Sequence, residues 1–401
     1  MCVKSEKQRI LFFNAQHGFG GCTSVHLAIM KHLDRSRYQV FVATHTPLAG
    51  DRFGEARDAT RINLTLPQIQ GSMWQRITSS WKTFVSLLYL VWYIRLRRVH
   101  LLHTTEKPRD SFYGLLVARA GGCKHILHAH LGYFHLNPSR PVRFALRHTD
   151  RIVTVSEHCR RTFLAAGYAP SHVSAVLNSV DTERFRPTVD PLDLRSLLHL
   201  PSSSKLIGII GRIYEGKGQG DLVEAMADVV SHIPDAHLVI VGSDDMRGMG
   251  ESTDSTHSYS DDLRARAVVL GIQDHVHFVP WRTDTERVFK GFDVAVNASF
   301  EEPFGLVVVE AMGVGVPLVA TAAGGIPEIV TNENDALLVS PHAPNELACA
   351  IRRILEDKDL ASRLTQNARA TVETRFAEAS TADQMQQVYT EVLRQSISAA
   401  K

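Results

Sequence analysis

Glu302 and Glu310 are two carboxylates separated by seven residues, in a stretch that follows a predicted strand. A helix is predicted to begin near Gly305. Because successive helical residues are rotated by about 100°, Glu302 belongs to the loop before this helix and Glu310 lies more than one turn inside it. The free N–H groups and the positive dipole end at the helix start suit a diphosphate or a hydroxyl-rich sugar.

A second stretch carries two cations in a glycine-rich loop. A strand is predicted to end at Gly211, and Arg212 and Lys217 follow before a helix that starts at about Asp221. Arginine offers a fork of donors to phosphate oxygens, and lysine offers a mobile point charge. Surface cations are usually only solvated, but two at one strand end, in an acidic half of the chain, predict a polyanion site.

These residues must be positioned by alternating strands and helices, which the apolar runs of the chain predict. The expected strands of the first half are residues 9–13, 38–44, 100–103, 125–128 and 151–155. Those of the second half are residues 206–210, 237–241, 276–279, 292–296, 317–320 and 336–339. We therefore expect an α/β protein of two Rossmann-like doubly wound domains, residues 1–188 and 200–376. Residues 242–262 are polar and predict a long mobile loop.

Length and composition agree with this division. The chain has 401 residues, of which 44% are hydrophobic and 21% charged, and this is too long for one ordinary core. The five cysteines are scattered without a C-x-x-C pair, which predicts neither a disulfide framework nor a zinc site and favours a reducing compartment. The apolar run 10–13 is too short for a secretion signal. We expect a cytoplasmic protein.

The charge is distributed unevenly. Residues 1–188 contain 26 basic and 11 acidic side chains, a net charge of +15, whereas the remainder carries −13. The opposition indicates that the two halves meet different partners. The basic half is expected to face an anionic partner, either an acceptor molecule or a membrane surface.

One hydrophobic stretch, residues 73–98, has large apolar side chains at helical spacing. Its uncharged core spans only residues 83–94, whereas a membrane span needs about 20 apolar residues. The stretch is therefore either a buried core helix or an interfacial helix flanked by Arg95, Arg97 and Arg98.

The order and spacing of several motifs resemble a known family, the retaining glycosyltransferases of family 4, which have the GT-B fold of two Rossmann-like domains facing across a cleft. The resemblance covers nearly the whole chain. Its motifs are Gly20-Gly21, Val155-Ser-Glu157, residues 178–185, Gly211-Arg212, Lys217-Gly218, Glu302 to Glu310, and residues 323–328. In such enzymes the last helix returns to the first domain, which implies the same for residues 377–401.

The resemblance also implies roles for individual residues. Arg212 and Lys217 match residues that hold the donor diphosphate, Glu310 matches a glutamate that binds the ribose hydroxyls, and Glu302 would lie by the donor sugar. His130 matches the active-site histidine of the first domain, with His128 as a nearby competitor. The remaining donor-binding residues implied are Gly20, Gly21, Gly211, Phe304, Gly305 and Leu306.

The implied activity is retaining transfer of a hexose or related sugar from a nucleoside diphosphate donor (UDP, GDP or ADP) to an acceptor hydroxyl, in glycan, polysaccharide or lipopolysaccharide synthesis. The expected acceptor is a glycan or a lipid-linked molecule, and no nucleic acid partner is expected. The enzyme would be cytoplasmic or peripheral at the inner face of a membrane, with residues 73–98 as the candidate contact.

No cofactor or required metal is expected. Histidine is abundant, and five histidines lie near predicted strand ends of the first half: His17, His103, His128, His130 and His135. None has the i, i+4 spacing of a ligand set, and Asp244-Asp245 is not the Asp-x-Asp of metal-dependent glycosyltransferases. The cations Arg212 and Lys217 would neutralise the leaving diphosphate instead.

Three other functions deserve comparison. A nicotinamide dehydrogenase is disfavoured because Thr23 stands at the third glycine position of G-x-G-x-x-G, and the strand 38–44 ends without the acidic residue that binds ribose. A nucleotide-sugar epimerase or hydrolase shares the fold and diphosphate site but uses no acceptor. A non-catalytic subunit is the third alternative, and a donor-turnover assay separates both from a transferase.

Overall fold

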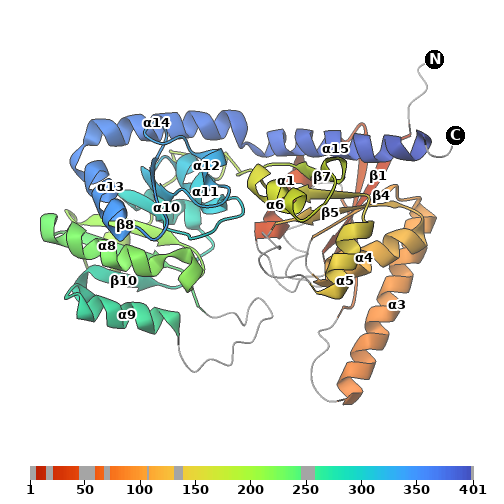
Figure 1. Ribbon diagram of the computed structural model, residues 1–401, viewed down its shortest axis with the longest axis horizontal. Helices are drawn as coiled ribbons and strands as arrows, with labels where there is room; N and C mark the ends of the chain where they lie inside the picture. Colours follow the sequence, from red (N-terminus) through yellow and green to blue (C-terminus); the bar gives the residue numbers. More distant parts are fainter. Residues whose placement is uncertain are drawn as a thin grey trace. The chain divides into compact units, whose positions relative to one another are not determined.

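The structure is a computed structural model that describes residues 6–14, 21–44, 59–66, 73–105, 108–130, 139–244 and 258–398 (Figure 1). The chain forms two compact units. Unit 1 consists of residues 1–178 and 378–401, and unit 2 of residues 179–377. The expected first domain ended at residue 188, but residues 179–188 belong to unit 2. One reason is an ion pair in which Arg184 lies 2.6 Å from Glu286.

Unit 1 is built on a parallel sheet of seven strands in the order β3-β2-β1-β4-β5-β6-β7. The strands are β1 Gln8–Asn14, β2 Tyr38–Thr44, β3 Thr60–Asn63, β4 Leu101–Thr105, β5 Lys124–Ala129, β6 Arg151–Thr154 and β7 Val173–Ala175. The central strands are almost entirely buried, as expected for a parallel sheet covered on both faces.

The helices of unit 1 cover this sheet. They are α1 Gly21–His32, α3 Met73–Arg97, α4 Pro108–Gly121, α5 Arg140–His148, α6 Glu157–Ala165 and α15 Glu378–Ser398, with a 3-10 turn, η2 Pro170–His172. The C-terminal helix α15 packs on α1 and buries Tyr389 completely. The Tyr38 hydroxyl lies 3.3 Å from the carbonyl oxygen of Gln386, which joins α15 to β2.

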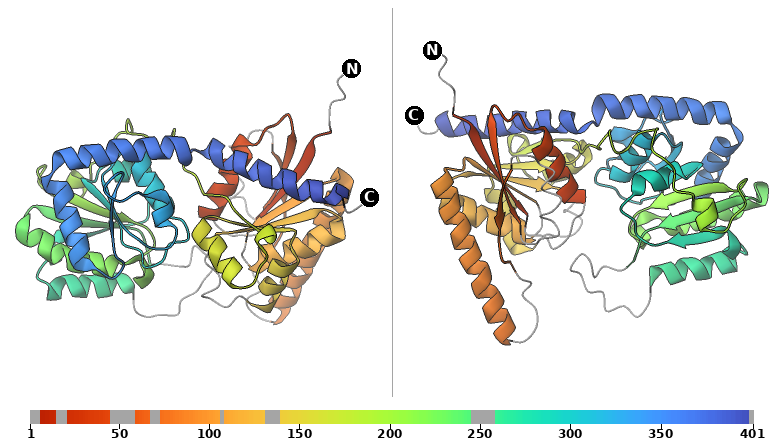
Figure 2. Two further views of the ribbon diagram at one scale, coloured as in Figure 1. Left: turned by 45° about the horizontal axis from the view of Figure 1, so that its top comes forward. Right: turned by 180° about the vertical axis from the view of Figure 1, so that it is seen from behind.

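The buried side chains described for helix α3 lie on one face of the helix. Leu90, Tyr93 and Ile94 are buried in a core cluster of unit 1. The helix extends beyond the sheet of unit 1, as its orange ribbon in Figure 2 shows. No helix in the described ranges combines the length and apolar character needed to cross a membrane.

Unit 2 has a parallel sheet of six strands in the order β10-β9-β8-β11-β12-β13. Its strands are β8 Lys205–Ile210, β9 Ala236–Val241, β10 Val276–Val279, β11 Val294–Asn297, β12 Leu318–Thr321 and β13 Leu337–Val339. This order repeats the 3-2-1-4-5-6 pattern of a Rossmann domain. Both units are therefore doubly wound, which confirms the fold class predicted from the apolar runs.

Ten helical segments complete unit 2 in the described residues. They are α7 Leu194–Leu197, η3 Glu215–Lys217, α8 Gln219–His232, α9 Tyr259–Val269, η5 Gln273–His275, α10 Thr285–Lys290, α11 Leu306–Val314, α12 Ile326–Ile329, α13 Pro344–Glu356 and α14 Lys358–Arg375. Helix α9 begins inside the segment 242–262 that was expected to be a loop. Residues 245–257 of that segment lie outside the described residues.

The strand order locates the ligand crevice of unit 2. From β8 the chain proceeds to β9 and β10 on one side, and β11 begins the other side, so the order switches between β8 and β11. In open α/β sheets, ligands bind beyond the carboxyl ends of the strands at such a switch point. The loops that follow these two strands are residues 211–218 and 298–305, which contain the predicted polyanion residues.

Candidate functional site

Glycine packing brings the two loops of unit 2 together. Gly218 has φ = 68° and ends the first loop before α8. A Cβ atom at Gly218 would lie 2.0 Å from the carbonyl oxygen of Ala298, at the start of the second loop. The backbone N–H of Phe300 also donates to the carbonyl of Gly216 at 3.0 Å. The two loops therefore meet through their backbones, and only glycine fits at position 218.

Lys217 and Glu302 form an ion pair across this contact. The Lys217 Nζ donates to Glu302 Oε2 at 2.5 Å, and both side chains are largely buried. The Ser299 hydroxyl lies 3.3 Å from the same oxygen. The structure thus unites two predicted site residues that are far apart in the sequence, and a charged ligand entering here meets a lysine whose position is already fixed.

A glycine pair fixes the backbone of Glu302. The Gly325 N–H donates to the Glu302 carbonyl at 2.8 Å. Gly324 has φ = 56°, and a Cβ atom there would lie 2.1 Å from the same carbonyl oxygen. The motif 323–328 therefore packs directly on the Glu302 peptide, which explains why it needs two small residues.

Helix α11 begins at the same place. Gly305 precedes it with φ = 114°, and Phe304 is buried against Phe376 with ring centroids 5.9 Å apart. Leu306 is the first residue of the helix. The N–H groups of the first helical turn lack partners within the helix, so the start of α11 carries partial positive charge beside Glu302.

Glu310 lies on the second turn of α11 and is half-buried. Burial raises the pKa of its carboxyl to about 7, while the nearby Arg184 lowers it and Glu286 raises it further. Glu310 is therefore protonated in about half of the molecules at neutral pH.

Arg212 and Gly211 follow β8 directly. The Arg212 side chain is exposed, and its guanidinium carbon lies 5.2 Å from the centroid of the Tyr214 ring. The Arg212 carbonyl accepts a hydrogen bond from Gln219 Nε2 at 2.8 Å, which ties the loop to the start of α8. The backbone of Arg212 is thus fixed, and its side chain extends from the loop at the switch point.

In unit 1, His130 follows β5 and is buried beside His128, with ring centroids 4.2 Å apart. Both rings lie in one cluster, so the structure does not separate the two candidates. Gly21 is the first residue of α1, whereas Gly20, His17 and His135 lie outside the described residues.

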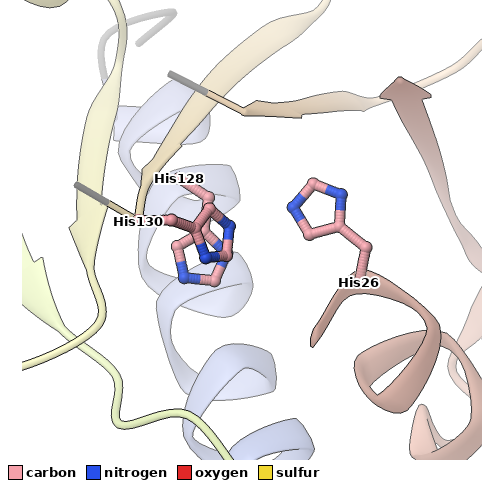
Figure 3. Close-up of side chains that lie close together, drawn as sticks. All are labelled: His26, His128 and His130. Atoms are coloured by element: carbon pink, nitrogen blue, oxygen red, sulfur yellow. The ribbon is translucent and has the colours of Figure 1, made fainter. Parts of the chain in front are cut away.

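The sequence analysis missed a third member of this cluster, His26 of α1. Its ring centroid lies 5.6 Å from that of His128 and 5.7 Å from that of His130 (Figure 3). Burial lowers the pKa of His26 to about 3 and the pKa values of His103 and His128 well below the usual range. These rings are therefore neutral at physiological pH.

The two units match two family models. Residues 194–371 match "Glycosyl transferases group 1", and residues 19–184 match "Glycosyltransferase Family 4". The chain belongs to glycosyltransferase family 4. Its fold is the GT-B fold. The structure of Anabaena HepE in complex with UDP and glucose superimposes with a TM-score of 0.77 at 23% identity, covering 96% of this chain and 99% of HepE.

Two curated relatives illustrate the range of the family. D-inositol 3-phosphate glycosyltransferase of Corynebacterium glutamicum is 29% identical over 56% of this chain, and the match spans only 53% of the relative's length. UDP-Gal:alpha-D-GlcNAc-diphosphoundecaprenol alpha-1,3-galactosyltransferase of Escherichia coli is 25% identical over 78% of this chain and 80% of its own. This chain spans about half the length of the D-inositol 3-phosphate glycosyltransferases that it matches, 49–56% in three of them.

Proposed function

We propose that this family 4 member transfers a sugar from a nucleoside diphosphate donor to an acceptor hydroxyl, with retention of configuration and without a required metal. The observation that carries the proposal is the meeting of Lys217, Glu302 and the start of α11 at the switch point of unit 2. A fixed cation, a carboxylate and a helix N-terminus supply what a diphosphate and a sugar need from a protein.

Each side chain has a stated part in the proposed reaction. Arg212 and Lys217 bind the diphosphate and stabilise the negative charge that grows on it as the bond from the sugar C1 to the phosphate oxygen breaks. The start of α11, including the backbone of Leu306, adds its dipole to the same oxygens. Glu302 accepts hydrogen bonds from the sugar, and Lys217 then bridges Glu302 and the diphosphate.

Glu310 anchors the other end of the donor. Its ionised carboxylate accepts hydrogen bonds from both ribose hydroxyls, which fixes the nucleoside relative to the diphosphate. The acceptor oxygen forms the new bond to C1, and its proton passes to the leaving phosphate oxygen. In unit 1, the proposed active-site residue is His130, which matches the active-site histidine of similar enzymes.

Retention by this same-face route has one rival, a double displacement in which Glu302 forms a glycosyl-enzyme. Glu302 already shares one carboxylate oxygen with Lys217 and Ser299, which lowers its nucleophilicity. Incubation with a slow fluorinated donor followed by mass spectrometry tests this point. Labelled Glu302 overturns the same-face route, and an unlabelled enzyme that still turns over the donor supports it.

The activity itself is tested by nucleotide release and product formation with UDP-, GDP- and ADP-sugars in the presence of EDTA. UDP-glucose is the first donor to try, because HepE has been solved in complex with it. Lys217→Met is expected to lower turnover about 100-fold. Lys205→Met is the matched control, because Lys205 lies at the opposite end of β8. Equal turnover in both variants contradicts the proposed site.

The proposal extends to an acceptor at an anionic membrane surface, and helix α3 supports this part. Among the described side chains of α3, seven large apolar ones are exposed: Trp81, Phe84, Val85, Leu88, Tyr89, Trp92 and Leu96. At about 100° per residue they form a stripe about 140° wide, opposite the buried face of the helix. A helix that is apolar on both faces needs a second apolar environment.

The charged side chains of α3 also suit an anionic membrane surface. Lys82, Arg95, Arg97 and Arg98 accompany the stripe, and residues 73–98 contain no acidic side chain. Tryptophan and tyrosine favour the boundary between lipid headgroups and acyl chains, and basic side chains favour anionic lipids. Helix α3 therefore suits interfacial binding, parallel to the membrane, which brings unit 1 to a lipid-linked acceptor.

Vesicle binding tests the membrane contact. Replacing Trp81 and Trp92 together by serine is expected to remove about 2 kcal/mol of transfer free energy, which weakens binding to anionic vesicles about 30-fold. Trp281→Ser is the matched control, because Trp281 of unit 2 is 66% exposed and Trp81 is 64% exposed. Equal binding of the double variant and the control, or equal binding to neutral vesicles, overturns the contact.

A further inference from the structure

Three buried histidines of unit 1 converge at the carboxyl edge of its sheet. His26 comes from α1, His128 from the end of β5, and His130 directly follows β5. One ring nitrogen of each lies within 4.8 Å of one nitrogen of each of the others (Figure 3). Three nitrogen ligands thus approach one point from two elements.

Two of the three buried rings, those of His26 and His128, need polar partners. Within the described ranges, neither ring nitrogen of His26 nor of His128 has a hydrogen-bond partner, although both rings are fully buried. A neutral imidazole has one N–H donor and one lone pair. Each polar atom left unsatisfied in the interior destabilises the folded state. The cluster therefore requires a partner that accepts lone pairs or supplies hydrogen bonds.

The ligand chemistry selects the class of partner. His128 and His130 are two residues apart at a strand end, which directs both rings to one face, and His26 completes the three. The group contains imidazoles and no carboxylate among the described residues, so hard cations that prefer oxygen do not suit it. Three imidazoles with one open position are a typical ligand set for zinc and similar transition metals.

The geometry requires only a small adjustment. Zinc–nitrogen bonds of about 2.0–2.1 Å place tetrahedral ligand nitrogens about 3.4 Å apart. The ring nitrogens therefore need to approach one another by at most about 1.4 Å to bind one ion. His103 packs against the cluster. Its ring centroid lies 4.6 Å from that of His26, and its Nδ1 lies 2.7 Å from the Tyr389 hydroxyl.

We propose that His26, His128 and His130 bind one divalent transition-metal ion of the zinc class, and that the bound ion inhibits the transferase. The inhibition rests on the proposed function, because His130 is also the proposed active-site residue of unit 1. A ring nitrogen that coordinates a metal is not available to a sugar. The site is then regulatory and is compatible with transfer that needs no metal.

Zinc binding to the full-length chain tests the site without reference to activity. After removal of metals with EDTA and dialysis, wild-type protein is titrated with Zn²⁺ by calorimetry, and bound zinc is counted by elemental analysis. We expect one equivalent per chain. His26→Phe retains the ring that packs on Phe12 but removes both nitrogens, and we expect it to weaken binding at least 100-fold.

Two further variants keep the result decisive. His237→Phe is the matched control, since His237 of unit 2 lies next to His277, with ring nitrogens 3.1 Å apart, and is outside the cluster. His26→Gln serves if His26→Phe fails to fold. Absence of bound zinc in the wild type, or equal affinity in the wild type and the His26 variants, overturns the site.

Activity then tests the inhibition separately. If the proposed function holds, Zn²⁺ lowers sugar transfer by the wild type and by His237→Phe, and His26→Phe resists the inhibition. Stoichiometric zinc binding without inhibition overturns the regulatory half. If no donor is turned over at all, the proposed function fails while the zinc titration still decides the metal site.

Discussion

The raised pKa of the Glu310 carboxyl predicts that donor binding strengthens as the pH rises. Burial raises its pKa to about 7, which is well above the usual range of a glutamate. The ionised carboxylate accepts hydrogen bonds from two ribose hydroxyls, whereas the protonated carboxyl has a donor in place of one acceptor. The donor therefore binds the ionised form, and binding below pH 7 must expel a proton.

The size of the effect follows from the pKa. With a pKa of 7, about a tenth of the Glu310 carboxyls are ionised at pH 6 and about nine tenths at pH 8. If only the ionised form binds, the dissociation constant of the donor falls about tenfold between these two pH values. The change is concentrated around pH 7.

The assay is calorimetric titration of a sugar nucleotide at pH 6, 7 and 8. A sugar nucleotide is preferable to a free nucleoside diphosphate, because its diphosphate is esterified at both ends and does not titrate in this range. Glu310→Gln is the control: it keeps the size of the side chain but removes the titrating group. We expect weaker binding in this variant with no change between pH 6 and 8.

Two results would refute the reasoning. The first is a wild-type dissociation constant that does not change between pH 6 and 8. The second is the same pH dependence in Glu310→Gln, which would assign the titration to another group. The stability of the ligand-free protein changes with pH in the opposite direction to donor binding. Because the pKa of Glu310 is raised in the folded state, the stability contributed by its neutral form is full below the usual pKa of a glutamate. This stability is lost as the pH rises through 7.

Three further substitutions each test one interaction of the structure. Arg184→Met removes a cation that lowers the pKa of Glu310, so the midpoint of the pH dependence moves above 7; an unchanged midpoint contradicts this. Gly324→Ala places a Cβ atom against a backbone carbonyl at positive φ, and urea denaturation should show a loss of about 2–4 kcal/mol in unfolding free energy. Tyr389→Phe leaves the buried Nδ1 of His103 without its hydroxyl partner and should cost about 1–3 kcal/mol in the same assay; no loss refutes the bond.

Local sequence patterns predicted the central strands well. The expected strand 38–44 coincides with β2, and the expected strand 206–210 differs from β8 by one residue. These strands are buried on both faces, so they are continuous apolar runs that stand out in the sequence. Strands β3 and β7 were not predicted, because they are edge strands of four and three residues and form no continuous apolar run.

The candidate site was predictable only in part. Lys217 and Glu302 carry recognisable chemistry in their own loops, but their ion pair depends on β8 and β11 being neighbours. Local patterns contain no information on strand order. His26 was missed for a related reason: a histidine on the buried face of a helix resembles any core residue until the fold places other histidines beside it.

The most direct test of the proposed donor site is binding of UDP, GDP and ADP to the protein in EDTA, measured by thermal unfolding. Ligand at a hundredfold excess over its dissociation constant stabilises the folded state by about 2.7 kcal/mol. We predict stabilisation of the wild type by one of the three nucleotides, lost in the double variant Arg212→Ala, Lys217→Ala. Stabilisation that requires added Mg²⁺, or that survives in the double variant, would contradict a metal-independent site at these two cations.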